Sequence, residues 1–166
     1  MATPTPIGVQ ALLLAAGSGS RLRPLTDQWP KSLMPIGGRP LMEYWLESLW
    51  SVGIRDVLVN VHHHADQMMR FLKRPRYREW VTATHEVRPL GTAGTLISNR
   101  DFFKGSKILL VHADNWSRCD LGGFLEYHNH RRPGGCPVTM MTFDTLVPET
   151  CGIVETDASG VVIGFH

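Results

Sequence analysis

A short apolar run that ends in a glycine-rich loop places the strongest constraint on the fold. Residues Val9–Ala16 read Val-Gln-Ala-Leu-Leu-Leu-Ala-Ala and stop at Gly17. A strand with one face in water alternates apolar and polar residues, whereas this run is almost continuously apolar. The run therefore predicts a strand buried on both faces, as in a parallel sheet. A loop rich in Gly, Ser, Arg and Pro follows, from Gly17 to about Arg39.

Apolar runs and amphipathic segments then alternate along the chain. Pro40 suits a first helical position, and apolar residues recur at helical spacing as far as Trp50, before a stop at Gly53. The elements expected next are a strand at Asp56–Val61, a helix at Ala65–Leu72 that ends before Pro75, a strand at Trp80–His85, a short helix at Thr92–Ser98 and a strand at Lys107–Ala113. Such alternation favours right-handed crossovers, and so predicts an α/β fold with a doubly wound, mostly parallel sheet in three α/β/α layers.

The C-terminal part of the sequence changes to a strand-like pattern. Asp120 is expected to cap a helix with one face formed by Leu121, Phe124, Leu125 and His128. Strands are expected at Val138–Phe143, Gly152–Glu155 and Val161–Phe165. No second domain is indicated, so residues 1–166 are expected to form a single domain, with residues 1–7 flexible.

Composition excludes several classes of protein. The chain has 166 residues, of which 43% are hydrophobic and 19% charged, and its net charge is +2, which argues against a disordered chain and against a dedicated nucleic-acid binder. The longest apolar stretch, Ala11–Ala16, is too short to span a membrane, and the N-terminus lacks the pattern of a secretory signal. Three widely spaced cysteines are expected to be reduced thiols in a cytoplasmic protein. The sequence is also compatible with a homo-oligomer.

The glycine loop after the first strand allows three interpretations. A dinucleotide-binding fingerprint needs a third glycine, but Leu22 occupies that position, and a Walker loop needs Gly-Lys-Ser/Thr, which is absent. The third interpretation is a different phosphate cradle, in which small residues let backbone N–H groups converge on an anion. Arg21 and Lys31 then supply positive charge. Ligands of parallel sheets bind beyond the carboxyl ends of the strands, so the loops after Ala16, Val61, His85 and Ala113 are expected to border the site.

The longer string resembles the signature of the sugar nucleotidyltransferases. Leu14-Ala-Ala-Gly-Ser-Gly-Ser-Arg-Leu-Arg-Pro-Leu-Thr26, followed by Pro30-Lys31 and Leu33, is similar to the family pattern, with Ser20 where the family usually has Thr. Downstream, Glu86 with Pro89–Gly94 resembles the base-recognition loop of the family. Val111–Asn115 resembles its metal-binding strand end more loosely, and Cys151–His166 resembles the stretch around its sugar pocket. The resemblance implies a Rossmann-like nucleotidyltransferase fold whose C-terminal part this chain lacks.

The resemblance also implies a reaction. A sugar 1-phosphate attacks the α-phosphorus of a nucleoside triphosphate, which gives a nucleotide-sugar and pyrophosphate without a covalent enzyme intermediate. Arg21 and Lys31 would be the catalytic residues, on the pyrophosphate and the α-phosphate respectively, and Asp114 would bind Mg²⁺. The implied nucleotide-binding residues are Ala15, Gly17, Ser18, Gly19, Ser20, Glu86, Gly91, Thr92 and Asn115, and Gly152 would approach the sugar.

The nucleobase and the rival functions remain open in the sequence. The string Pro89–Gly94 resembles most the members that use GTP with mannose 1-phosphate or a related sugar, but UTP and dTTP members share parts of it. One alternative is a module or fragment that binds nucleotide without turnover. Another is a nucleotide-sugar-dependent glycosyltransferase, whose Asp-x-Asp metal motif is absent at Ala113–Asn115. His62-His63-His64 is interpreted as a polar turn rather than a metal site, and the role of Asn60 near a strand end is undecided.

Overall fold

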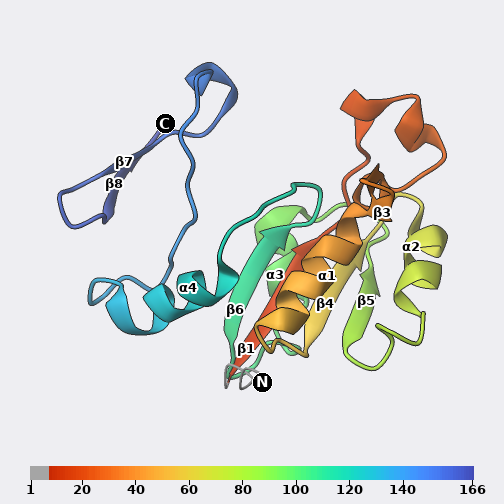
Figure 1. Cartoon of the computed structure of the whole chain (residues 1–166), viewed down its shortest axis with the longest axis horizontal. Coiled ribbons are helices and arrows are strands. Elements are labelled where there is room, and N and C mark those ends of the chain that lie inside the picture. The colour runs from red at the N-terminus through yellow and green to blue at the C-terminus, as the bar shows by residue number, and fades with distance from the viewer. Residues whose placement is uncertain (1–7) are drawn as a thin grey trace. The chain divides into compact units, whose positions relative to one another are not determined.

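The computed structural model describes residues 8–166, which divide into two compact units at residues 118 and 119. Residues 1–7, expected to be flexible, lie outside the described residues. The first unit contains a four-stranded parallel sheet in the order β5-β4-β1-β6 (Figure 1). Its strands are β1 (Val9–Leu14), β4 (Val57–Val61), β5 (Val81–His85) and β6 (Lys107–His112). All four lie within the strands that the sequence predicts.

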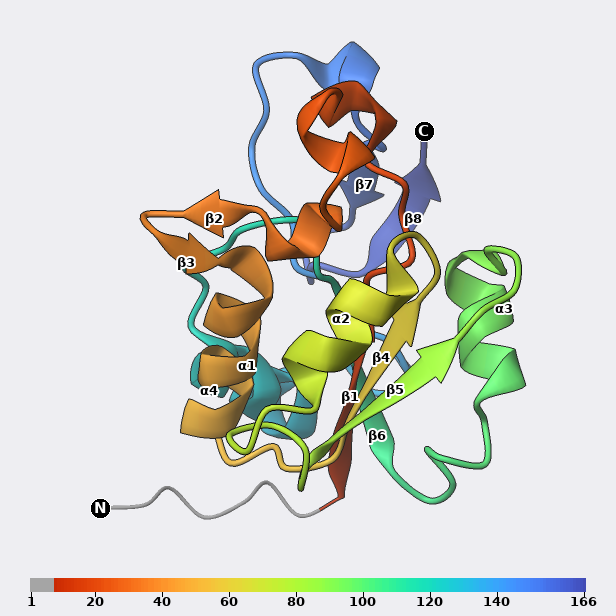
Figure 2. The same ribbon diagram turned by 90° about the vertical axis from the view of Figure 1, so that its right-hand side faces the viewer.

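Helices cover both faces of this sheet. α1 (Leu41–Ser51) and α2 (Ala65–Leu72) connect β1 to β4 and β4 to β5, and α3 (Gly91–Ser98) leads back to β6 on the other side of β1. The sheet seen nearly on edge has α1 and α2 on one side and α3 on the other (Figure 2). The predicted α/β fold with a parallel sheet between two helical layers is therefore confirmed.

The ends of the helices differ slightly from the expected positions. α1 begins at Leu41, with Pro40 as its extended N-cap, and the chain leaves it through Gly53, whose φ of +86° requires the left-handed region. The loop between β1 and α1 contains three short 3₁₀ turns, η1 (Ser20–Leu22), η2 (Leu25–Asp27) and η3 (Lys31–Leu33), and the small ladder of β2 (Pro35–Ile36) with β3 (Arg39–Pro40).

The second unit holds one helix and one hairpin. α4 (Leu121–Glu126) begins at Asp120, whose Oδ1 accepts a hydrogen bond from the Gly123 N–H at 3.0 Å. The α-helix ends at Glu126, before His128, and the chain continues as a π-helical turn, η4 (Tyr127–Arg131). A 3₁₀ turn, η5 (Pro148–Thr150), and the antiparallel hairpin of β7 (Val154–Thr156) and β8 (Val162–Phe165) follow.

The predicted strand Val138–Phe143 is wrong. In the described residues this segment forms no ladder with another strand, and side chains such as Phe143, which is 79% exposed, lie in solvent. Its valine, threonine and phenylalanine favour a strand locally, but a strand persists only when a neighbour pairs its backbone groups.

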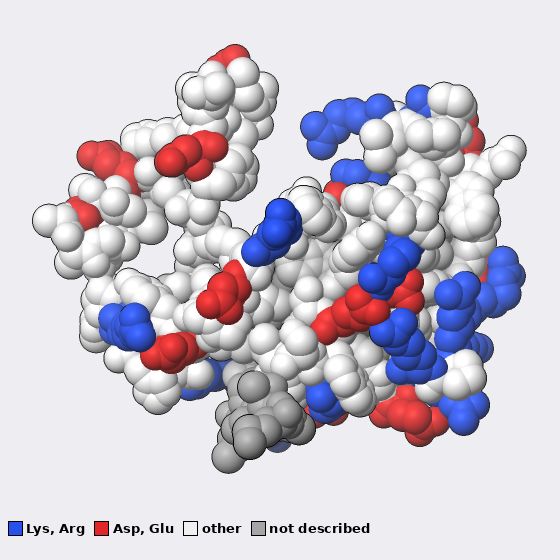
Figure 3. Space-filling view, in the orientation of Figure 1, with Lys and Arg blue, Asp and Glu red and all other residues white. Residues whose placement is uncertain are grey.

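Charged side chains of both signs interleave over α1. Figure 3 shows acidic groups there flanked by basic ones. Arg39 and Arg76 each form ion pairs with Glu43 and Glu47. The Tyr77 hydroxyl donates to Glu43 at 2.7 Å, and burial together with this carboxylate raises the pKa of Tyr77 to about 12. Among residues 8–166, no helix has both the length and the apolar character needed to cross a membrane.

The apolar core between the sheet and α3 provides a test of the fold. Leu12 is fully buried and packs with Leu58 and Phe103. Leu12→Ala is expected to lower the free energy of unfolding by about 2–5 kcal/mol, because it removes buried methyl groups and leaves a cavity. Chemical denaturation measures the change. Ile108→Ala, at a partly exposed position of β6, is the control and should cost far less; equal losses would contradict the assigned core.

Candidate nucleotide-binding site

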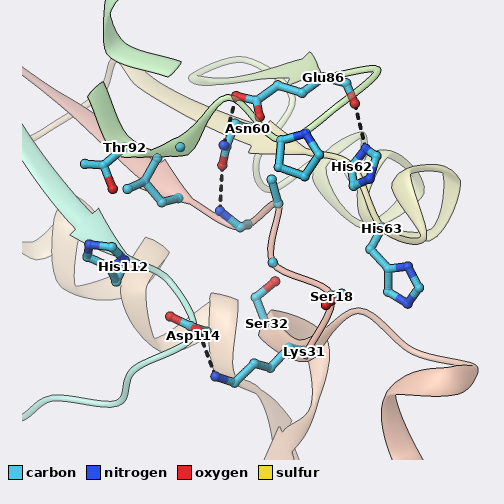
Figure 4. Close-up of a pocket in the computed structure, with 16 residues that line it drawn as sticks. Ser18, Lys31, Ser32, Asn60, His62, His63, Glu86, Thr92, His112 and Asp114 are labelled. Atoms are coloured by element: carbon cyan, nitrogen blue, oxygen red, sulfur yellow. Dashed lines mark hydrogen bonds and ion pairs between the residues drawn. The ribbon is translucent and has the colours of Figure 1, made fainter. Parts of the chain in front are cut away.

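A cavity of about 330 Å³ opens at the carboxyl edge of the sheet. Its wall is formed by the segments that follow β1, β4, β5 and β6, together with η3, as the sequence predicts for this edge (Figure 4). The predicted site residues that line it are Ala15, Gly17, Ser18, Lys31, Glu86, Gly91, Thr92 and Asp114.

Four other predicted residues of the first unit do not line the cavity. Gly19, Ser20 and Arg21 belong to the turn that follows Ser18, and Arg21 is exposed. Asn115 follows Asp114, and its backbone carbonyl accepts a hydrogen bond from Trp45 Nε1 at 2.7 Å, which ties the end of β6 to α1.

Gly152, the predicted sugar residue, belongs to the second unit. A Cβ atom at this position would lie 2.7 Å from Cζ of Phe165, so a larger residue there would have to displace the exposed ring of Phe165.

The glycine loop folds back on itself around Gly19. Gly19 has a φ of +65°, and a Cβ atom there would lie 2.8 Å from Thr26 Cγ2 and 3.1 Å from Lys31 Cβ. The buried Thr26 hydroxyl donates to the Gly19 carbonyl at 2.9 Å. Glycine at this position therefore lets the loop close tightly enough to bring Lys31 beside it.

Histidines 62, 63 and 64 hold backbone carbonyls rather than converging on one point. The Nε2 atoms of His63 and His64 donate to the Thr26 carbonyl at 3.2 and 3.1 Å, and Nδ1 of His62 donates to the Glu86 carbonyl at 2.8 Å. In the described residues no cluster of three His, Cys, Asp or Glu side chains is arranged to hold a metal. The triplet therefore ties the turn after β4 to the glycine loop on one side and to the segment after β5 on the other.

A buried hydrogen-bond network joins three sides of the cavity. The Ala15 N–H donates to Asn60 Oδ1 at 2.6 Å, and Asn60 Nδ2 donates to Glu86 Oε1 at 3.0 Å and to Thr95 Oγ1 at 3.2 Å. The Thr95 hydroxyl donates to the same Glu86 oxygen at 2.5 Å. Asn60, Glu86 and Thr95 are all buried, so each bond is shielded from water and the loops after β1 and β5 are held to α3.

Glu86 is mainly engaged inside the protein. Its Oε2 accepts a further hydrogen bond from the Leu90 N–H at 3.1 Å. Burial raises the pKa of Glu86, but hydrogen bonds from Thr95, Asn60 and Leu90 outweigh burial, and the pKa stands below its ordinary value of 4.5. A carboxylate has about four acceptor positions, and three are used here, which leaves one for a ligand.

Lys31 and Asp114 form an ion pair at the cavity wall. Lys31 Nζ donates to Asp114 Oδ2 at 2.7 Å, and the two side chains are 22% and 35% exposed. η3 carries the lysine, and the segment after β6 carries the aspartate, so residues 83 positions apart meet. The two residues that the resemblance places on phosphate and metal therefore neutralise each other in the structure.

Sequence reasoning left the role of Asn60 undecided, assigned His62 only to a polar turn, and missed Ser32 and His112 altogether. Asn60 interrupts an otherwise apolar buried strand, a signal that could have marked it as a polar anchor. Ser32 occupies the variable position of Pro-Lys-x-Leu, and His62 and His112 lie at strand ends without a motif of their own.

Replacing the charge of Glu86 tests the network. Glu86→Gln is expected to lower the free energy of unfolding by about 2 kcal/mol at neutral pH, because an amide supplies fewer acceptors to the same three donors. The pKa of Glu86 is lower in the folded protein, so its stabilising effect is complete above 4.5 and disappears as the pH falls through the folded pKa. Denaturation between pH 7 and pH 3 should therefore show the gap between wild type and variant closing below about pH 4.5.

The control for this prediction is Glu79→Gln, since Glu79 is exposed and paired only with Arg78 in the described residues. A pH-independent gap for Glu86→Gln, or a gap no larger than that of the control, would contradict the network.

Comparisons with known proteins identify the family of the chain. The profile of the family described as nucleotidyl transferase matches residues 10–166. Mannose-1-phosphate guanylyltransferase 1 of Arabidopsis thaliana is 31% identical over 156 residues, which cover 91% of this chain and 42% of the plant protein. Mannose-1-phosphate guanylyltransferase catalytic subunit beta of Drosophila melanogaster is 32% identical over 163 residues, which cover 95% of this chain and 43% of the fly protein.

The fold is also similar to a solved structure, that of HddC from Yersinia pseudotuberculosis complexed with GMP-PN. The TM-score is 0.71 at 20% identity, over 94% of this chain and 68% of the other. The chain spans less than half the length of the two guanylyltransferases named above. The profile nevertheless covers nearly all of the chain and both units, and the chain belongs to the nucleotidyl transferase family.

Proposed function

We propose that the protein to which this chain belongs transfers a nucleotidyl group from a nucleoside triphosphate to a sugar 1-phosphate, with release of pyrophosphate. The observation that carries the proposal is the Lys31–Asp114 pair, which stands at the carboxyl edge of a parallel sheet beside a glycine loop. A cation for phosphate and a carboxylate for a hard metal ion are the groups that such a transfer requires. Family membership supports the reaction class, and residues 1–166 would belong to one nucleotidyltransferase domain.

The proposed chemistry needs no protein nucleophile. An oxygen of the sugar phosphate attacks the α-phosphorus in line, a new P–O bond forms, and the α–β bridging bond breaks so that its electrons leave with pyrophosphate. Backbone N–H groups from Gly17 to Ser20 would hold the triphosphate, and Arg21 would pair with the departing pyrophosphate. Lys31 would move from Asp114 to the α-phosphate, where its charge stabilises the transition state.

The nucleobase would lie against Ala15, Gly91 and Thr92, where small side chains permit a flat ring to approach. GTP is favoured, because the relatives named above are guanylyltransferases and HddC was solved with GMP-PN. Glu86 has one acceptor position left, so it would accept one hydrogen bond from guanine. Asn115 would contact the ribose, and Gly152 would approach the sugar.

Asp114 fits a magnesium ion that arrives with the triphosphate. Mg²⁺ is commonly held by one or two carboxylates, several waters and substrate phosphates, and Asp114 offers a partly exposed carboxylate on the cavity wall. When bound, the ion would neutralise charge on the phosphates. We also propose a cytoplasmic location, which is supported by three widely spaced cysteines that form no disulfide in the described residues.

Removing the charge of Lys31 tests the proposed catalytic role. With GTP, UTP or dTTP, mannose 1-phosphate and Mg²⁺, the wild type should release pyrophosphate, fastest with GTP. Lys31→Ala should lower kcat about 10²–10³-fold, because the contact strengthens as charge moves in the transition state. Lys73→Ala, at an exposed lysine outside the cavity, should leave kcat unchanged.

Two results would count against the reaction. Nucleotide binding without pyrophosphate release from any combination would instead support a binding module. An unaltered kcat in Lys31→Ala would remove the lysine from the chemistry.

Asp114→Asn separates metal binding from nucleotide binding. The Mg²⁺ concentration for half-maximal activity should rise about tenfold or more, since an amide is a weaker ligand for a hard cation. Metal-free GTP should bind at least as tightly as to the wild type, because Lys31 is released and a negative charge near the phosphates is lost. Pyrophosphate release at graded Mg²⁺ concentrations measures the first quantity, calorimetry measures the second, and Asp101→Asn is an exposed control. A lower affinity for metal-free GTP, with an unchanged Mg²⁺ concentration for half-maximal activity, would contradict the assignment of Asp114 to the metal.

A further inference from the structure

Ser32 has a buried hydroxyl without a partner on the wall of the cavity. Its side chain is 1% exposed, and within residues 8–166 its Oγ makes no hydrogen bond. Ser32 lines the same cavity as Ser18, Lys31 and Asp114, and Figure 4 shows its hydroxyl turned toward the interior of that cavity. A buried hydroxyl that lacks a partner costs free energy in the folded protein, so its presence requires an explanation.

The same loop satisfies another buried hydroxyl. Thr26, which is equally buried, donates to the Gly19 carbonyl at 2.9 Å. The backbone around Ser32 is also satisfied, since the Leu33 N–H donates to Pro30 and the Met34 N–H donates to Lys31. An alanine at position 32 would pack equally well, so the contacts of the free protein do not explain why a hydroxyl is present there.

The position of Ser32 in the cavity indicates the chemistry of its partner. In Figure 4, Ser18, Ser32, Lys31 and Asp114 lie on one side of the cavity, and Asn60, Glu86 and Thr92 lie on the other. The side with Lys31 and the glycine loop is suited to phosphate, whereas the side with Glu86 and α3 is suited to a base. A serine hydroxyl donates readily to an anionic oxygen, and such bonds are stronger than those between neutral groups.

We propose that Ser32 Oγ donates a hydrogen bond to a phosphate oxygen of the nucleoside triphosphate, beside Lys31. This proposal rests on the proposed function, since it assumes that the cavity takes a triphosphate. Ser32 is then a substrate-binding residue that is left without a partner until the ligand arrives. The hydroxyl therefore lowers the stability of the free protein and forms a hydrogen bond in the complex.

This assignment predicts that stability and affinity change in opposite directions in Ser32→Ala. The free variant should melt at the same temperature as the wild type or higher, because an unsatisfied buried hydroxyl is removed. Its affinity for GTP and for inorganic triphosphate should fall by the same factor, about tenfold, because both ligands present the phosphates. Thermal melting and calorimetry with each probe measure these changes.

Two further variants calibrate the experiment. Thr26→Val removes a hydroxyl that has a partner, and it should lower the Tm. Ser32→Cys keeps nearly the same volume with a weaker donor, and its affinity should lie between those of wild type and Ser32→Ala.

Each contrary result has its own meaning. Unchanged affinity in Ser32→Ala, or a Tm that falls as in Thr26→Val while affinity is retained, would overturn the assignment and leave the proposed function intact. A loss of affinity for GTP but not for inorganic triphosphate would overturn the contact with phosphate. A wild-type chain that binds neither probe would overturn the proposed function, and this proposal with it.

Discussion

The amide of Asn60 is the contact on which the rest of the site depends. It stands in the inner strand β4, accepts a hydrogen bond from the Ala15 N–H after β1, and donates to Glu86 after β5 and to Thr95 in α3. One buried side chain thereby joins the glycine loop to the segment that would hold the base. Because a buried amide left without partners is costly, these loops are held in one arrangement by the folded sheet. The cavity is therefore formed before any ligand binds.

The Lys31–Asp114 pair is the part of this frame that a ligand can rearrange. Both side chains are partly exposed, and their pairing gives the cavity wall no net charge from these two groups. A triphosphate with its metal offers each of them a stronger partner, a phosphate for the lysine and a cation for the carboxylate. Exchange of partners would convert a neutral resting pair into two charged contacts on the reacting groups. Asn60 and Glu86, being buried, stay as they are.

The sequence predicted what local pattern controls. The continuous apolar run Val9–Ala16 correctly indicated a strand buried on both faces, and Asp120 correctly marked the start of α4. Val138–Phe143 was predicted as a strand on propensity, and no partner strand pairs with it in the described residues. The pairing of Lys31 with Asp114 and the network of Asn60 join residues 26 to 83 positions apart, which no local pattern encodes. Ser32 was missed because its significance lies in a contact that the free protein does not make.

A crystal structure of the chain with a non-hydrolysable GTP analogue and Mg²⁺ tests whether Lys31 and Asp114 exchange partners. We expect a triphosphate against the glycine loop, Lys31 Nζ on a phosphate oxygen and no longer paired with Asp114, and the Asn60 contacts unchanged. An intact Lys31–Asp114 pair with the nucleotide bound elsewhere, or a rearranged Asn60 network, would contradict this expectation.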